Sequence, residues 1–305
     1  MPLITKTLFS PTRQMTITLL MNELGISRSD AQRFVVRGRV SQNGVIVDEQ
    51  FGFIEGACEV VCFEPHPRGL KPMFVANDFA VYDKPSGVRV HPNNLETYYT
   101  LNDEIKHTFG NDANATHRID QETSGLVLVS RHKQSEGVLK QLFANRHITK
   151  HYLAMVRGNL SEPLDIQEPL FRNDHPDLKI SMVVKVDTRG KRAHTLVTPL
   201  HYFPEYDITL IKASPLTGRT HQIRVHLFHV KHPIVGDPIY AQSIENIYRY
   251  IDKEIQGEER IRNTGASRLL LHAQSLEFDY SGEKYKIKSQ KDFVKECFEA
   301  MKIQI

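Results

Sequence analysis

The chain has 305 residues, 40% of them hydrophobic and 25% charged, with a formal net charge of +3. This is the composition of an ordinary globular protein that can bury a full core, so a disulfide-dependent scaffold is excluded. The mild positive charge is compatible with an RNA partner but does not require one.

The three cysteines, Cys58, Cys62 and Cys297, form no C-x-x-C pair. Such a sparse, odd set predicts reduced thiols in the cytosol, with Cys58 and Cys62 filling core space. The N-terminus has no apolar segment of signal-peptide length, and no stretch approaches the ~18–20 apolar residues of a membrane helix. We therefore expect a cytoplasmic protein with no membrane partner.

Residues 1–12 are expected to form a tail, either free or folded back onto the body, and a small domain over residues 13–66 follows it. Apolar residues at helical spacing between positions 17 and 24 predict the first helix of this domain. Gly25 is its expected C-terminal stop, since glycine readily adopts the left-handed conformation found there.

A second helix and a hairpin complete the small domain. Ser27 followed by Asp30 is typical of a helix start, and Gly38 is expected to end that helix. Asn43-Gly44 lies between two short apolar runs, which is the strongest short signal for a β-hairpin.

Four arginines of the small domain lie close together in the sequence. Arg28, Arg33, Arg37 and Arg39 fall in a twelve-residue window, although residues 1–66 carry six basic and seven acidic side chains. We therefore expect a local basic face that binds RNA, not a basic domain. The alternative is an ordinary solvated helix face.

A turn-rich linker over residues 67–75 leads into a larger domain over 76–305, in which predicted strands and helices alternate. The expected strands are 79–83, 126–129, 151–156 and 207–213, and the expected helices are 101–109, a segment around 138–143, 220–230 and 291–301. Thr220 is expected to cap its helix. The polar segment 165–192 is expected to be a hairpin or a mobile arm, and the charged helical segment 243–262 is given no catalytic role.

The stretch 116–131 contains the most informative loop of the chain. A polar turn there runs into the apolar segment 126–129, which is long enough for a buried strand and too short for a helix. Gly125 lets the backbone turn at the junction. Asp120 therefore lies in a loop fixed to a rigid strand, which suits a reactive group. The alternative is that Asp120 and Thr123 only form the turn.

His117-Arg118-Ile119-Asp120, with Thr123-Ser124-Gly125-Leu126 after it, resembles the signature of the RluA-type pseudouridine synthase family. Four further segments resemble other motifs of that family, in the expected order. They are Asp83-Lys84-Pro85-Ser86-Gly87 with His91-Pro92, the K-x-Y-x-A run 150–154, GRTHQIRVH at 218–226 with Gly236-Asp237-Pro238 and Tyr240 after it, and LLLHA at 269–273. One departure is Gln121, which stands where the family often has a basic residue. The domain over 13–66 in turn resembles an S4-type RNA-binding domain.

These resemblances imply an α+β fold. The catalytic domain would be a mixed, mainly antiparallel sheet flanked by helices, with a small S4-like α/β domain before it. They imply an isomerase that converts uridine in RNA to pseudouridine with no metal and no other cofactor. Relatives with an S4-like domain often act on large-subunit ribosomal RNA, so ribosomal RNA is the expected partner and transfer RNA the second candidate. A monomer with no obligate protein partner is expected.

The resemblance also implies the roles of the site residues. Asp120 would be the nucleophile, and Arg224 the adjacent cation that keeps it charged in a partly dry pocket. Tyr152 would stack on the uracil and help to move the C5 proton. Arg118 would fill the gap left by the flipped base, with His117 beside it on the RNA-binding side. The alternatives are a core tyrosine at 152 and a helix-surface arginine at 224.

Other functions are compatible with parts of the sequence. A non-catalytic RNA-binding or ribosome-assembly factor would keep the S4-like domain, but it would not need Asp120, Tyr152 and Arg224 together. A metal-dependent nuclease would need a metal site, and the closely spaced histidines lack nearby cysteines or a second ligand cluster; these are His147, His151, His226, His229 and His232. Ser124 with a distant histidine would suggest a hydrolase, but no G-x-S-x-G elbow is present.

Overall fold

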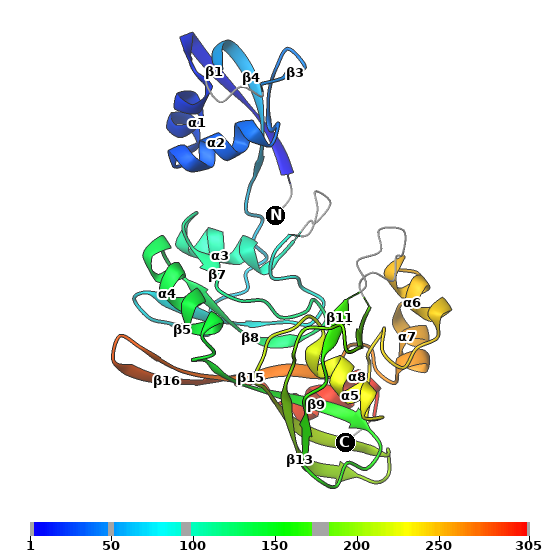
Figure 1. Ribbon diagram of the computed structural model, residues 1–305. Coiled ribbons are helices and arrows are strands. Elements are labelled where there is room, and N and C mark those ends of the chain that lie inside the picture. The colour runs from blue at the N-terminus through cyan, green and yellow to red at the C-terminus, as the bar shows by residue number, and fades with distance from the viewer. Residues whose placement is uncertain (1–2, 48–51, 93–98, 173–182, 304–305) are drawn as a thin grey trace. The chain divides into compact units, whose positions relative to one another are not determined.

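The computed structural model describes residues 3–47, 52–92, 99–172 and 183–303 (Figure 1). The chain divides into two compact units, one made of Met1–Arg68 with Pro92–Glu104 and the other of Gly69–His91 with Ile105–Ile305. Both units combine helices with mainly antiparallel sheets, so the expected α+β class is confirmed. None of the described helices has the length and apolar character needed to cross a bilayer.

The N-terminal unit has a four-stranded antiparallel sheet in the order β1-β4-β2-β3, and two helices pack on it. Its elements are β1 (Leu3–Met15), α1 (Thr16–Leu24), α2 (Arg28–Val36), β2 (Val40–Gln42), β3 (Val45–Ile46) and β4 (Phe53–Phe63). Both predicted helices and the hairpin are confirmed. Gly25 ends α1 with a φ of 61°, and the Ser27 side chain caps α2 by accepting the Asp30 N–H. Cys58 and Cys62 are buried, as expected.

The predicted tail over residues 1–12 is folded back onto the body in the part that the structure describes, but it is wrong that this part lies outside the small domain. Leu3–Met15 form β1, which pairs antiparallel with β4 from Leu3↔Phe63 to Met15↔Phe53. The strand alternates between core and solvent, so that Leu8 is buried while Phe9 is exposed. Pro11 lies where the register shifts, between Ser10 and Gln14, and this irregularity masks the strand signal in the sequence.

The larger unit contains a ten-stranded sheet in the order β10-β13-β14-β9-β15-β8-β6-β5, with β16 paired to β15 and β7 paired to β8. Its strands are β5 (Phe74–Val75), β6 (Phe79–Lys84), β7 (Asn114–Ala115), β8 (Ser124–Ser130), β9 (Thr149–Arg157), β10 (Leu164–Ile166), β13 (Thr195–Phe203), β14 (Ile208–Pro215), β15 (Leu271–Tyr280) and β16 (Glu283–Lys288). The boundary between the units falls within α3 (Leu101–Phe109), after Glu104. The other helices of the larger unit are α4 (Lys133–Ala144), α5 (Gln222–His229), α6 (Ile244–Ile251), α7 (Gly257–Thr264) and α8 (Phe293–Met301).

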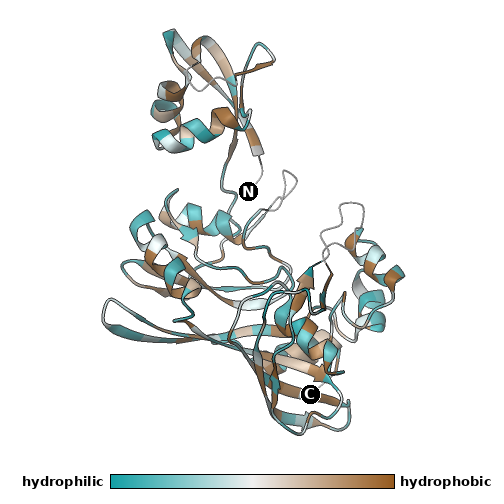
Figure 2. Cartoon of the chain, in the orientation of Figure 1, coloured by the Kyte–Doolittle hydropathy of each residue, from teal (hydrophilic) through white to brown (hydrophobic). Residues whose placement is uncertain are grey.

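The buried strands of the larger unit consist mainly of hydrophobic residues, and helices pack against them (Figure 2). One apolar cluster packs α5 and α8 against β9, β13, β14 and β15. A second packs α4 against β6, β8, β15 and β16. All seven residues of β8 are buried, which explains the apolar run that the sequence shows there.

The parallel pairing of β8 with β15 fixes the start of β8. His272 lies opposite Ser124 and Ala273 opposite Gly125, whereas the other described pairs of this sheet are antiparallel. Gly125 has a φ of 108°, and a Cβ there would lie 2.4 Å from the Ala273 carbonyl oxygen. Only glycine permits this approach, so the 116–123 loop enters the sheet at a defined place.

Three details of the larger unit differ from the sequence expectations. Thr220 does not cap α5, because His221 is the N-cap residue and Gln222 instead reaches back to accept the Arg219 N–H. The strand β13 was not expected, since Pro199 interrupts its pattern at a register shift. The apolar pattern of the segment around 138–143 places Val138 on the inner stripe of α4, but Val138 is 49% exposed.

The segment 165–192 is largely a pair of short strands where the structure describes it. β11 (Leu170–Arg172) pairs antiparallel with β12 (Val184–Val186), as the hairpin expectation requires. β10, which overlaps the beginning of the segment, instead joins the edge of the main sheet beside β13. The part of the prediction that falls on residues 173–182 lies outside the described residues.

Candidate active site

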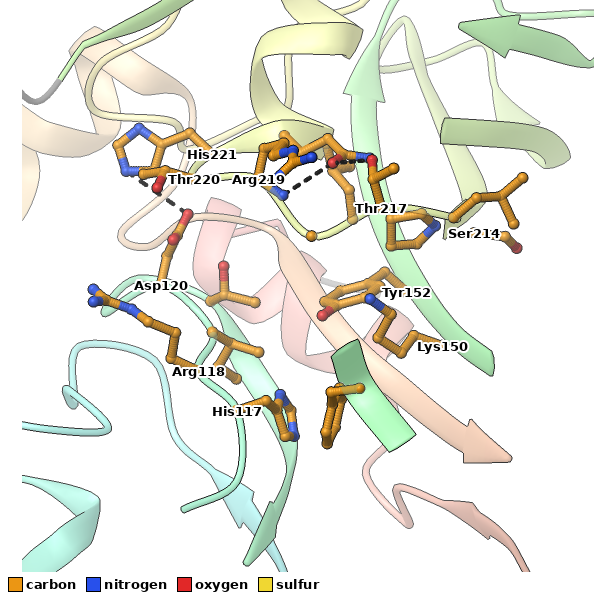
Figure 3. A pocket seen from close by; sticks show the side chains of 18 of the residues that line it. His117, Arg118, Asp120, Lys150, Tyr152, Ser214, Thr217, Arg219, Thr220 and His221 are labelled. Carbon is orange, nitrogen blue, oxygen red and sulfur yellow. Dashed lines mark hydrogen bonds and ion pairs between the residues drawn. The ribbon is translucent and has the colours of Figure 1, made fainter. Parts of the chain in front are cut away.

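A cavity of about 870 Å³ opens in the larger unit, at the ends of β8, β9 and β14 and the start of α5. Its walls come from four of the sequence segments that carry the family resemblance. Figure 3 shows His117, Arg118 and Asp120 on one side, Lys150 and Tyr152 on another, and the loop from Thr217 to His221 across from them. This is the size of pocket that binds small molecules or an extruded nucleotide.

Asp120 is held by the backbone of its own loop. The Thr123 N–H donates to the Asp120 carbonyl, and the Gly87 N–H donates to the Gln121 carbonyl. The ammonium of Lys84 is completely buried and donates to the carbonyls of Pro85, Val88 and Gln121. Burial lowers the pKa of Lys84 to about 7, although the charges of Asp120 and Glu122 oppose this shift. Lys84 is therefore a support for the loop and does not face a ligand.

Arg224 joins Asp120 to a second carboxylate, Asp237. Its Nη1 lies 3.2 Å from Asp120 Oδ2, while its Nε and Nη2 lie 2.7 and 2.8 Å from the two oxygens of Asp237. The side chains of Arg224 and Asp237 are 3% and 1% exposed, and that of Asp120 is 25% exposed. Asp237 thus fixes the guanidinium in a bidentate pair, and one remaining N–H points at Asp120.

The loop that carries Asp237 is itself closely packed. The Asp237 carboxylate accepts the backbone N–H groups of Ile239 and Tyr240, and the Tyr240 ring lies 5.1 Å from the Arg224 guanidinium. Gly236 has a φ of 80°, and a Cβ at that position would overlap the Arg268 carbonyl oxygen. The sequence shows Gly236-Asp237-Pro238 as a motif, but it gives no sign that Asp237 holds Arg224.

The neighbours of Asp120 keep its carboxyl ionised. Burial by itself raises the pKa of Asp120, but the cationic form of His221 and the charge of Arg224 lower it by more, so the net pKa lies below the ordinary value. Tyr152 is buried and faces the negative charge of Asp120, so both effects raise the pKa of its hydroxyl. At neutral pH the cavity therefore presents a carboxylate and a protonated phenol.

Sequence reasoning assigned no role to His221, which lies next to Asp120. Its Nε2 is 3.8 Å from Asp120 Oδ2, and its Nδ1 is 3.1 Å from the Tyr240 hydroxyl (Figure 3). Because Tyr240 Oη accepts the Val184 N–H, its own proton is available to Nδ1, which leaves the Nε2 proton on the side of Asp120. Burial lowers the pKa of His221 to about 4, so the ring is neutral at pH 7.

His117 and Arg118 lie in different environments. The Nε2 of His117 accepts the Leu128 N–H at 3.0 Å, and its ring stacks on Phe143 with centroids 4.3 Å apart. Burial, with the charge of Lys150, lowers the pKa of His117 to about 3, so this ring is a neutral part of the wall. Arg118 is exposed at the rim, where a nucleic acid could reach it.

The four N-terminal arginines are not equivalent. Arg28, Arg33 and Arg37 are exposed. Arg33 is paired with Asp30 at 2.7 Å, which offsets part of its charge. Arg39 is half-buried, with its guanidinium 5.6 Å from the Phe34 ring and 4.9 Å from the Phe63 ring.

The groups that suggested other chemistries are engaged elsewhere. Ser124 Oγ and His272 Nδ1 are 2.9 Å apart, but both residues are buried and neither lines the cavity. The two ring nitrogens of His226 bond to Thr195 and to the Glu168 carbonyl. Across the described ranges, no three His, Cys, Asp or Glu side chains are arranged to hold a metal ion.

Comparison with known proteins matches most of the chain. The family model described as RNA pseudouridylate synthase matches residues 78–229. An uncharacterized RNA pseudouridine synthase of Helicobacter pylori strain J99 is 38% identical over 92% of this chain and 93% of its own length. Ribosomal large subunit pseudouridine synthase C of Yersinia pestis is 35% identical over 72% of this chain and 65% of its own length. The solved structure of human RNA pseudouridylate synthase domain containing 1 superposes with a TM-score of 0.56 at 25% identity, covering 75% of this chain and 86% of the human one.

Proposed function

The chain belongs to the RNA pseudouridylate synthase family, and we propose that it isomerises uridines of large-subunit ribosomal RNA with Asp120 as nucleophile, Arg224 as its partner and Tyr152 against the base. The match confirms the RluA-type resemblance, and the enzyme is an isomerase of uridine in RNA. The observation that carries the residue assignment is the 3.2 Å contact between Arg224 Nη1 and Asp120 Oδ2 at the wall of a cavity that Tyr152 also lines.

The reaction sets the requirements for the site. Pseudouridine and uridine contain the same atoms, so the enzyme must break the N1–C1′ bond, form a C5–C1′ bond and transfer the C5 proton. A carboxylate that is ionised at neutral pH can hold the detached sugar covalently and release it again. Asp120 meets this requirement because its pKa lies below the ordinary value despite burial, and the Arg224 guanidinium beside it is the cation that is present at neutral pH.

Tyr152 supplies a flat ring and a hydroxyl beside the carboxylate. It lies on β9 between β14 and β15, opposite Ala213 and Ala273, so its backbone cannot shift without disturbing the centre of the sheet. Its raised pKa keeps the proton on the phenol, which can then take part in the movement of the C5 proton. The ring gives a face for uracil to stack on.

The cavity rim is suited to RNA. Besides Arg224, the residues that line the cavity include four with cationic side chains, namely Arg118, Arg146, Lys150 and Arg219. A basic rim attracts the phosphate backbone, and a target base must leave its stack to reach Asp120. We propose that the side chain of Arg118 occupies the space that the flipped base leaves in the stack. His117 lies in the cavity wall next to Arg118 and supports it there.

The departure at Gln121 is compensated nearby. Gln121 Oε1 accepts the Nε–H of Arg89 at 2.8 Å, and Gln121 Nε2 donates to the Gly87 carbonyl. This arrangement places the guanidinium of Arg89 beside the position where relatives often carry a basic residue. A cation for RNA is therefore kept, although it comes from a different part of the chain.

We assign the N-terminal sheet and its two helices, from β1 to about residue 66, to an S4-like RNA-binding domain, and the larger unit to the catalytic domain of a cytoplasmic monomer. The expected boundaries at 13 and 76 move outward to include β1 and β5. The two helices and the hairpin of the N-terminal unit support this assignment, as do exposed Arg28 and Arg37. The ribosomal target is supported by the name of the Yersinia pestis relative.

The test compares Asp120→Asn with Asp112→Asn, an exposed carboxylate that serves as the matched control. Pseudouridines are mapped in large-subunit ribosomal RNA and in transfer RNA after incubation with each purified variant. We expect product in ribosomal RNA with the wild type and Asp112→Asn, and none with Asp120→Asn. Product only in transfer RNA would refute the target, and product with Asp120→Asn would refute the nucleophile. RNA binding without any product would favour an assembly factor.

A further inference from the structure

Glu122, two residues after Asp120, is held by the segment that the sequence left without a role. Arg260 Nη2 donates to Glu122 Oε2 at 2.6 Å, and Tyr250 Oη donates to Glu122 Oε1 at 2.8 Å. The side chains of Arg260 and Glu122 are 14% and 12% exposed, so this is a mostly buried, charge-assisted contact. Tyr250 belongs to α6 and Arg260 to α7, and both therefore reach the loop of the proposed nucleophile.

The same helices also hold the loop on the other side of the ion pair. Arg260 Nη2 lies 3.4 Å from the Gly236 carbonyl, and the Gly236 N–H donates to the Thr264 carbonyl at the end of α7. Gly236 directly precedes Asp237, which fixes Arg224. Arg260 thus touches two loops that are far apart in the sequence, one carrying Asp120 and the other carrying the carboxylate behind Arg224.

The two helices are joined to each other at neighbouring positions. Arg249 on α6 pairs with Glu259 on α7 at 2.8 Å on the more exposed side, where their side chains are 35% and 33% exposed. One residue further along each helix, the guanidinium of Arg260 lies 5.6 Å from the Tyr250 ring. The outer pair holds the helices together, and the inner pair is directed at Glu122.

We infer that α6 and α7 form a clamp, made of Tyr250, Arg260 and Glu122, that sets the distance between Asp120 and Arg224. These three are positioning residues, since they act through the ion pair and none of them lines the cavity. The inference rests on the proposed roles of Asp120 and Arg224. A positioning role is favoured over a purely structural one because the contacts of these residues are with the two loops that carry the ion pair. Small displacements of reacting groups have large effects on rate.

The clamp also shields the nucleophile from a second negative charge. The charged and titratable groups around Asp120 are Lys84, Arg118, Tyr152, His221, Arg224 and Tyr240, and those around Glu122 are Lys84, Tyr250 and Arg260. Without Arg260, Glu122 would lose its hydrogen-bonded cation two residues from Asp120. The pKa of Asp120 would then rise, and the acid limb of the rate profile would move to higher pH.

The experiment measures single-turnover rates on ribosomal RNA from pH 3.5 to 8, together with RNA affinity and thermal stability. The variants are Arg260→Gln, Glu122→Gln, the double variant Glu122→Gln/Arg260→Gln and the control Arg249→Gln. We expect Arg260→Gln to lower the rate about 30- to 100-fold, with RNA affinity within about threefold of the wild type. The acid limb of the pH–rate profile of Arg260→Gln should move to higher pH. The double variant should return the limb toward the wild-type position, since neither charge remains.

A purely structural role predicts a different pattern. Arg260→Gln would then lose rate only in proportion to its unfolded fraction, and its pH profile would match that of Arg249→Gln. That result, or a rate within threefold of Arg249→Gln, would overturn the clamp. The failure of the proposed function is separate, because it would appear as activity in Asp120→Asn whatever the Arg260 variants do.

Discussion

Arginines in the two units of this protein illustrate two uses of the same side chain. Arg224 is buried, bound on both sides by carboxylates and packed on an aromatic ring. Arg28 and Arg37 on the N-terminal unit are exposed. A buried, fully paired charge fixes the position of its neighbours. An exposed positive charge attracts a polyanion such as RNA, and another exposed cation can take its place. We expect the two sets to respond very differently to substitution.

The largest effect is expected from Arg224→Gln. It leaves Asp237 buried without a cation and removes the donor from Asp120, so we expect a loss of about 3–5 kcal/mol in the free energy of unfolding. The rate should fall by at least about 10²–10³-fold. Chemical denaturation and single-turnover assays measure both. The double variant Arg224→Gln/Asp237→Asn should recover part of the stability and none of the rate; full recovery of rate would contradict the assignment of Arg224.

Tyr152→Phe tests whether the hydroxyl acts in the chemistry. Removing one oxygen keeps the ring for stacking, so we expect RNA affinity to stay within about threefold while the rate falls by roughly 10²–10⁴-fold. Tyr206→Phe, at a surface tyrosine of the same unit, is the control. A parallel loss of affinity and rate would show that Tyr152 serves only to bind the base.

The free energy of unfolding should depend on pH through the protonation of His221. Its pKa is lowered to about 4 by burial, so between pH 6.5 and 4 the unfolded chain binds a proton that the folded protein does not. The free energy of unfolding must therefore fall as the pH falls through this window, by up to about 3 kcal/mol for this one group. His221→Asn tolerates the left-handed backbone at φ 55° and should flatten the slope.

The control for this measurement is His229→Asn, because His229 is exposed on α5. Urea denaturation at several pH values gives the slope for each variant. Equal slopes for His221→Asn and the wild type would contradict the account of His221. Below this window, Asp120 contributes a further loss, since its folded-state pKa lies below the ordinary value and protonation weakens its contact with Arg224.

The smallest effects are expected at the N-terminal arginines. Arg28→Gln and Arg37→Gln should each change the free energy of unfolding by no more than about 0.5 kcal/mol. Each should reduce the salt dependence of RNA binding by about one unit of log–log slope, with an unchanged single-turnover rate. Arg39→Gln should instead cost about 1 kcal/mol of stability, because it loses the Phe34 and Phe63 rings. A rate change at Arg28 or Arg37 would contradict the division between the two sets.

Local signals in the sequence were sufficient for much of the fold. Periodicity, Gly25, the Ser27 cap and Asn43-Gly44 predicted the helices and hairpin of the N-terminal unit, because these signals act within a few residues. The apolar run of β8 predicted a buried strand, and Gly125 predicted a special backbone at its start. The same reasoning failed for β1 and β13, where Pro11 and Pro199 interrupt the alternation at irregular points of the pairing.

The sequence by itself, through its motifs, determined the family and brought attention to Asp120, Tyr152 and Arg224. Only the tertiary structure decided how Asp120 is surrounded, since its partner Arg224 is 104 residues away and Arg260 is 138 residues from Glu122. Asp237 and His221 lie in motifs, but nothing local showed what they contact, and the residues of the clamp gave no local signal. A carboxylate or imidazole has the same sequence context whether it faces water or a guanidinium. Pairing across the sheet brings these groups together, and their burial is what gives the pairing its strength.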